Sequence, residues 1–197
     1  MKSATAITVG LLIMVLAGFQ YSQEASGQAA AGWTTLFDGK SLKGWNAVGD
    51  ANWKLGDGVV QADKGTGFLV SDGTYGDFQL KAEIWVDDDA NSGIFIRCTD
   101  PKIPSATTGY EVNIFDKRPD PSFGTGAIVN VAKALTVLKA GGKWNTMEIT
   151  AQGPRMIVTL NGTRTVDAQD SSHAKGAIAL QYGAGVVKFR SVQIKPL

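Results

Sequence analysis

The placement of the glycines constrains the fold most strongly: 24 glycines separate short runs in which apolar and polar residues alternate. Alternation of this kind is typical of strands with one buried face, and no run keeps the 3.6-residue period of a helix. Many short strands without crossover helices predict an all-β chain, either a sandwich or a jelly roll. The predicted strands are 53–55, 59–62, 68–70, 78–86, 93–98, 110–115, 127–131, 144–152, 155–160, 177–182 and 187–194.

Turn residues place two hairpins explicitly. Gly56-Asp57-Gly58 joins the first pair of strands, and Gly153-Pro154 joins 144–152 to 155–160. Asn161-Gly162 then closes the latter strand with a further turn. Segments 99–108 and 117–125 each hold two prolines among small polar residues, so we expect surface loops at both ends of strand 110–115.

The first thirty residues have the pattern of an export signal. Lys2 supplies a positive end, the run from Ile7 to Phe19 is apolar, and small residues follow up to Ala31. An uncleaved anchor is the alternative, although the run is shorter than the ~20 residues of a membrane span. We therefore predict a signal peptide at 1–30, a single domain at 31–197 and a secreted or periplasmic protein without a stable membrane span after cleavage.

The charge balance excludes some partners. Lysine and arginine number 19 against 18 acidic residues, which gives a formal net charge of +1. Such a balance does not favour a nucleic acid or an anionic membrane as a partner. Cys98 is the single cysteine, so stability must come from packing, and alternation places Cys98 in the core beside Ile94 and Ile96.

Strand alternation predicts a polar face. If Tyr110, Val112 and Ile114 face the core, neighbouring positions in that strand and in three others face outward. The predicted outward residues are Glu83, Trp85, Phe95, Arg97, Glu111, Asn113 and Gln181. Carboxylate, amide and guanidinium groups can pair with vicinal hydroxyls, and aromatic rings can lie against a pyranose ring, so this face suits a sugar. The alternative is an ordinary solvated sheet face with cross-strand ion pairs.

Sequence motifs along nearly the whole chain after Trp33 resemble the 3-keto-disaccharide hydrolase domain family. Examples are Leu36-Phe37-Asp38-Gly39, Asn91-Ser92-Gly93-Ile94-Phe95-Ile96-Arg97, Gly109-Tyr110-Glu111-Val112-Asn113-Ile114-Phe115-Asp116, Gly176-Ala177-Ile178-Ala179-Leu180-Gln181 and Phe189-Arg190-Ser191. The resemblance implies a concanavalin-like jelly-roll β-sandwich and a glycoside substrate that carries a ketone at its third ring carbon.

The resemblance also implies that Asn91, Arg97, Glu111, Asp116 and Gln181 belong to the site region. A C3 ketone acidifies the proton on C2, so we expect Glu111 to act as the base, with Arg97 stabilising the enolate. Glu83, Asn91, Asn113, Asp116 and Gln181 are the expected substrate-binding residues.

One departure from the family leaves an alternative open. Family members commonly carry a histidine before a glycine after the Leu-Gln pair, whereas this chain has Tyr182-Gly183. If that histidine serves chemistry, the domain is a non-catalytic carbohydrate-binding module, and a purely structural exported domain is a third reading. The run Asp87-Asp88-Asp89 lacks a complete calcium-loop signature, so we predict a solvated turn and no metal site, and the cofactor requirement stays open.

Overall fold

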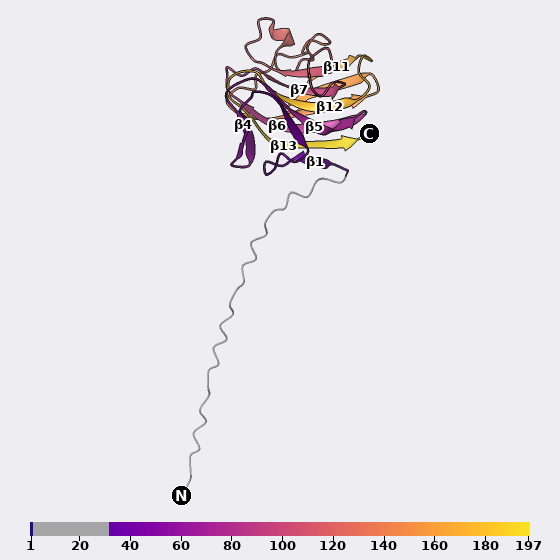
Figure 1. Ribbon diagram of the computed structural model, residues 1–197. Helices are drawn as coiled ribbons and strands as arrows, with labels where there is room; N and C mark the ends of the chain where they lie inside the picture. Colours follow the sequence, from indigo (N-terminus) through magenta and orange to yellow (C-terminus); the bar gives the residue numbers. More distant parts are fainter. Residues whose placement is uncertain (2–31) are drawn as a thin grey trace.

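The computed structural model describes Met1 and residues 32–197, and within this part the regular secondary structure is almost wholly β-strand (Figure 1). The strands are β1 (Thr34–Phe37), β2 (Trp45–Gly49), β3 (Lys54–Gly56), β4 (Val59–Ala62), β5 (Gly67–Tyr75), β6 (Phe78–Val86), β7 (Ser92–Cys98), β8 (Tyr110–Ile114), β9 (Trp144–Gln152), β10 (Arg155–Leu160), β11 (Thr163–Gln169), β12 (Gly176–Tyr182) and β13 (Val187–Pro196). A 3₁₀ helix, η1 (Pro121–Phe123), lies in the long connection after β8.

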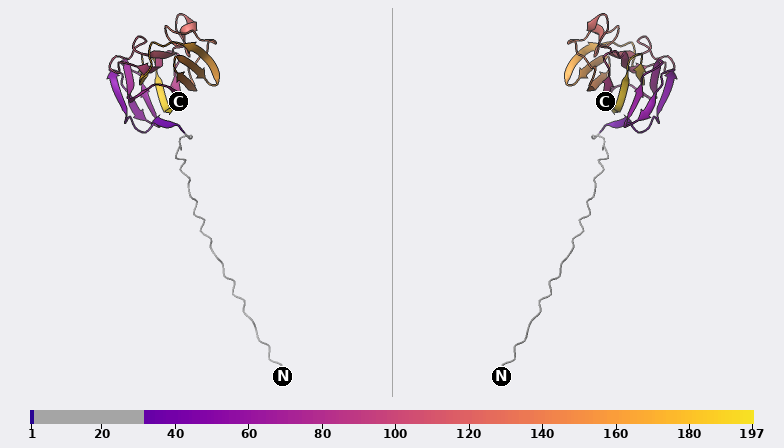
Figure 2. Two further views of the ribbon diagram at one scale, coloured as in Figure 1. Left: turned by 90° about the vertical axis from the view of Figure 1, so that its right-hand side faces the viewer. Right: turned by 90° about the vertical axis from the view of Figure 1, so that its left-hand side faces the viewer.

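Two antiparallel sheets form the domain. Sheet A has the order β11-β10-β9-β6-β13-β4-β3, with β1 pairing on β13, and sheet B has the order β2-β5-β12-β7-β8. Figure 2 shows the strands curving around a common interior, and Figure 1 places η1 at the opposite end of the molecule from β1. The predicted all-β jelly-roll sandwich is therefore confirmed.

The core between the sheets is apolar and continuous. Sheet A contributes alternate residues of β6, such as Leu80 and Ile84, and sheet B contributes Ile94, Val112 and Leu180, each fully buried. The same alternation turns the intervening residues of each strand away from the core. A second, smaller apolar cluster lies on the outer face of sheet B; its buried members are Val70, Phe95, Cys98, Ala177 and Ala179.

The predicted hairpins are present. Asp57 and Gly58 link β3 to β4, and Asn161 and Gly162 link β10 to β11, each pair having positive φ at both positions. A two-residue turn of this kind matches the twist of antiparallel strands and favours Asn-Gly or Asp-Gly. The Gly153-Pro154 turn between β9 and β10 is confirmed as well.

Strand prediction was wrong in a few places. Residues 127–131 form no strand; Ile128 makes isolated bridges to Val112 and Ala132, and hydrogen bonds hold this segment beside β8. Strands β1, β2 and β11 were missed because most of their residues are polar or exposed. Within residues 32–197, no helix has the length and apolar character that a membrane crossing requires. The predicted signal peptide lies outside the described residues, apart from Met1.

Candidate functional site

Glu111 and Gln181 both approach Gly93 on the outer face of sheet B. Glu111 in β8 pairs with Phe95 in β7, and Ala179 in β12 pairs with the same Phe95, so these three outward-facing residues lie side by side across the sheet. Gly93 lies between them and has no side chain: a Cβ built there would be 3.2 Å from Cγ of Glu111 and 3.4 Å from Oε1 of Gln181. The absence of a side chain at Gly93 therefore leaves space between the side chains of Glu111 and Gln181.

The Glu111 carboxylate is partly buried without a strong partner. Burial raises its pKa above the ordinary value of 4.5, and the positive charge of Arg118 opposes this only in part. No ion pair within residues 32–197 includes Glu111. A carboxylate that is desolvated in this way is a better base than a solvated one, and a carboxyl pKa raised by burial is a common mark of a functional group.

Two amide oxygens on the same face lack hydrogen-bond donors. Oε1 of Gln181 and Oδ1 of Asn113 are buried and have no partner among the described residues. Asn113 pairs with Gly93 across β7 and β8, and its amide nitrogen donates to the carbonyl of Phe123 at 2.7 Å. Since buried acceptors without donors are costly, this cluster of oxygen atoms favours a ligand that donates several hydrogen bonds.

A hollow of about 450 Å³, hollow 2, adjoins this cluster. Gln181 and Asn91 line it from the sheet, and the loop between β7 and β8 contributes Lys102 and Ile103. Ile103 is 65% exposed, so an apolar side chain stands at the rim. The loop predicted at 99–108 is thus confirmed, and Lys102, which sequence reasoning did not select, is the basic side chain that lines hollow 2 within the described residues.

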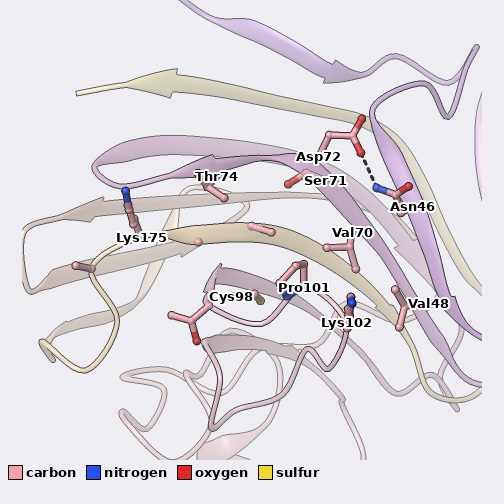
Figure 3. A pocket seen from close by; sticks show the side chains of 14 residues that line it. Asn46, Val48, Val70, Ser71, Asp72, Thr74, Cys98, Pro101, Lys102 and Lys175 are labelled. Carbon is pink, nitrogen blue, oxygen red and sulfur yellow. Dashed lines mark hydrogen bonds between the residues drawn. The ribbon is translucent and has the colours of Figure 1, made fainter.

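A larger hollow of about 700 Å³, hollow 1, lies further along the same face. Figure 3 shows its lining, with Val70 and Cys98 at the sheet and Pro101 and Lys102 on the loop. Val48 and Lys102 line both hollows, so the two adjoin. Together they form one groove along the outer face of sheet B.

Arg97 does not face this groove, which corrects the prediction from alternation. Ala177 pairs with Cys98 and Ala179 pairs with Phe95, so β7 carries one extra residue, a β-bulge, and Arg97 has a φ of 53°. The bulge reverses the side-chain direction beyond Ile96. Arg97 is 1% exposed, and its guanidinium lies at the end of the sandwich, where Nε donates to the carbonyl of Gly76 at 2.9 Å.

The remaining partners of Arg97 tie three segments together. Nη1 donates to the carbonyls of Gly153 at 2.8 Å and His173 at 3.2 Å, and Nη2 pairs with Asp77 at 2.9 Å. These groups belong to the β9–β10 turn, the loop before β12 and the β5–β6 turn. The guanidinium is therefore occupied by the protein itself. The bulge also moves Cys98 to the outer face, contrary to prediction, and burial raises its pKa to about 12.

Glu83 and Trp85 also lie away from the groove. Both belong to β6, which is in sheet A, so they face outward from the opposite layer. Glu83 accepts two hydrogen bonds from Arg190, at 2.8 and 3.1 Å, and this pairing lowers its pKa. The expectation that Glu83 shares a face with Glu111 was wrong because alternation assigns a side of a strand but not the sheet to which the strand belongs.

The other predicted residues divide between groove and scaffold. Asn91 lines hollow 2 and bridges to Ala184, so it lies near Gln181. Asp116 is engaged elsewhere: its carboxylate accepts from the hydroxyl of Thr125 and from the backbone N–H groups of Ala140 and Gly141. The structure thus brings Asn91, Glu111, Asn113 and Gln181 to one face, whereas Asp116 anchors a loop.

Two further segments have structural roles. Tyr182 is buried in the core and donates to the carbonyl of Gly185 at 3.0 Å, so the segment that departs from the family pattern turns its large side chain inward. In the acidic run, Asp87 accepts from the N–H of Val186, and Asp89 pairs with Lys117. Among the described residues no group of three or more His, Cys, Asp or Glu side chains is placed to hold a metal ion.

Comparison with known families decides the relationship. The family model of the 3-keto-α-glucoside-1,2-lyase-like domain matches residues 32–195. The chain belongs to this family. It is the same family whose motifs the sequence resembles, so the recognition from sequence is confirmed and the domain is related to glycoside metabolism. No curated protein matches the chain.

Solved structures share the fold. A protein from Parabacteroides distasonis ATCC 8503 described as a candidate glycosyl hydrolase is 27% identical with a TM-score of 0.71, covering 84% of this chain and 99% of that one. A second such protein from the same organism is 22% identical with a TM-score of 0.74, covering 84% and 94%. The carbohydrate-binding module CBM66 from Bacillus subtilis is 21% identical with a TM-score of 0.60, covering 83% and 95%.

Proposed function

We propose that the groove on sheet B binds a sugar at hollow 2 and that Glu111 cleaves 3-keto-glycosides. The observation that carries the proposal is the group of acceptors around Gly93: a carboxylate with a raised pKa beside two amide oxygens without donors. Sugar hydroxyls are donors at neighbouring ring carbons, so a pyranose ring satisfies such a group. Membership of the 3-keto-glucoside family and the glycosyl hydrolase neighbour support the same substrate class.

The chemical step needs one base and no external reactant. The Glu111 carboxylate removes the proton from C2, and the electron pair of that C–H bond forms an enolate with the C3 ketone. The enolate then collapses: a double bond forms between C1 and C2 while the bond from C1 to the glycosidic oxygen breaks. The proton held by Glu111 returns to the leaving oxygen, which departs as an alcohol. A carboxyl pKa raised by burial suits a group that must both take and give a proton.

Charge stabilisation passes to residues other than Arg97. The Arg97 guanidinium donates to three carbonyls and to Asp77, so we do not assign it to stabilising the enolate. In its place we assign the amide groups of Asn91 and Gln181 to the ring oxygens and the ammonium group of Lys102 to the leaving oxygen. Each of these residues lines hollow 2.

The decisive experiment measures alcohol release from 4-nitrophenyl 3-keto-glucoside by the wild type and two matched variants. Glu111→Gln keeps the shape of the side chain and removes the base, so release should fall by at least about 10²-fold. Glu83→Gln makes the same change on the opposite sheet and should leave release unchanged. Loss of turnover in Glu83→Gln, or full turnover in Glu111→Gln, would remove Glu111 from the role assigned to it.

A binding function is the second candidate, and the position of Arg97 favours it. Without the expected guanidinium, the groove has fewer groups for charge stabilisation while keeping its acceptors. CBM66, a carbohydrate-binding module with this fold, illustrates such a function. In that case calorimetry detects binding of unoxidised methyl glucoside, Gln181→Met abolishes the binding, and no 3-keto-glucoside is cleaved.

A further inference from the structure

Hollow 1 is large enough for a ligand group of its own. Its volume of about 700 Å³ falls within the ~300–1,000 Å³ of ordinary small-molecule sites. It lies over β5 and β12, and the loop after β7 forms the facing wall. Hollow 2, which holds Asn91 and Gln181, does not need this space for a single sugar ring.

The floor of hollow 1 is apolar. Val70, Ala177 and Cys98 form it, and all three belong to the apolar cluster on the outer face of sheet B. With a pKa of about 12, the Cys98 thiol stays protonated at neutral pH and acts as a small apolar side chain. Val48 and Pro101 continue the same character on the walls (Figure 3).

Polar groups stand at the rim. Thr74 and Lys175 are exposed at one end, and Asn46 donates to Asp72 at the other, so these two side chains already satisfy one another (Figure 3). A second sugar ring on this floor would bury several hydroxyl groups against aliphatic side chains, which costs free energy for each hydroxyl left without a partner. A flat hydrocarbon group makes no such demand.

The junction of the hollows fixes the relation between the two parts of a ligand. Val48 and Lys102 line both hollows, so a group attached to the anomeric carbon of a sugar in hollow 2 enters hollow 1 beside these residues. We propose that hollow 1 is the leaving-group subsite and that the substrate is a glycoside of a flat, apolar alcohol such as a phenol rather than a disaccharide. This inference rests on the proposed placement of the sugar.

The test compares the 4-nitrophenyl and methyl 3-keto-glucosides in the wild type and two variants. Thr74→Trp places a bulky ring in hollow 1 from an exposed strand position, and Thr163→Trp makes the same change at an exposed position of β11 in sheet A. The measured quantity is the ratio of kcat/KM for the two substrates in each protein. Differences in intrinsic leaving-group reactivity cancel when these ratios are compared between proteins.

We expect Thr74→Trp to lower this ratio by about tenfold, because burying ~60 Å² of apolar surface at ~25 cal/mol/Å² gives that factor. Thr163→Trp should leave the ratio unchanged, and matching melting curves establish that both variants are folded. An unchanged ratio in Thr74→Trp overturns the inference while leaving the proposed function intact.

A binding measurement distinguishes failure of the proposed cleavage from failure of the proposed leaving-group subsite. If the wild type cleaves neither substrate, the proposed cleavage is overturned, and calorimetry with unoxidised phenyl and methyl glucosides decides the inference alone. Tighter binding of the phenyl compound that is lost in Thr74→Trp supports the subsite. Equal binding of both compounds, or binding of neither, overturns it.

Discussion

Replacement of Arg97 by methionine should destabilise the fold and spare the groove. Methionine keeps most of the aliphatic stem and loses the guanidinium, which donates to the carbonyls of Gly76, Gly153 and His173. The Asp77 contact adds little because that carboxylate is 42% exposed and well screened. Three charged hydrogen bonds at ~1.5 kcal/mol each, the lower end for a charged donor, give a loss of about 4–5 kcal/mol.

Urea unfolding followed by tryptophan fluorescence measures this loss, and a change of ~4–5 kcal/mol is large against the ~5–15 kcal/mol of a typical domain. Asp77→Asn is the control: it removes the charge while keeping an acceptor for the N–H of Gly153, and it should cost less than about 1 kcal/mol. At a temperature where Arg97→Met is folded, its affinity for phenyl glucoside should equal that of the wild type. A stability loss below about 1 kcal/mol together with lost binding would refute the structural role.

Three further predictions concern the groove. Burial holds the Glu111 pKa above 4.5, so the ionised carboxylate disfavours the folded state at neutral pH. Glu111→Gln should therefore raise the free energy of unfolding at pH 7. Urea titrations should show this gain shrinking as the pH falls through the raised pKa and vanishing below pH 4.5. Gly93→Ala puts a methyl group 3.2 Å from Cγ of Glu111, so calorimetry should show about tenfold weaker glucoside binding with the melting temperature nearly unchanged. Lys102→Met should slow release of methanol about tenfold more than release of 4-nitrophenol, since a poor leaving group depends more on charge stabilisation; equal slowing would exclude Lys102 from the leaving oxygen.

Local pattern carried much of the fold. Asn161-Gly162 and Asp57-Gly58 identify their hairpins because only certain residues adopt positive φ without strain, and the alternation in β8 and β12 correctly turned Glu111 and Gln181 to one side. These features depend on residues close together in the chain, so they can be predicted from the sequence.

The errors came from non-local pairing and from one backbone irregularity. β6 and β7 are consecutive strands and yet belong to different sheets. Alternation therefore predicted correctly that Glu83 points away from the core, but the sheet to which it was assigned was wrong. The bulge at Arg97 could not be predicted from a glycine, because the residue with the positive φ of 53° is the arginine itself. The contacts of its guanidinium with Gly76, Gly153 and His173 are made by distant segments, which a local pattern cannot reveal.

Loop placement was the other missing information. Lys102 and Ile103 lie in a segment that sequence identifies only as a loop, and their position opposite β2 and β5 follows from how that loop folds back over sheet B. The signal that pointed to the loop was its pair of prolines among small polar residues. No pattern in the sequence singles out Lys102 within it.

The location of the sugar is tested most directly by a crystal structure of Glu111→Gln with phenyl glucoside bound. We predict the ring in hollow 2, with hydroxyl groups donating to Gln181 and Asn91 and with the phenyl group over Val70 and Ala177. A ligand bound instead on the outer face of sheet A, beside Glu83 and Trp85, or a groove without ligand at saturating phenyl glucoside, would contradict it.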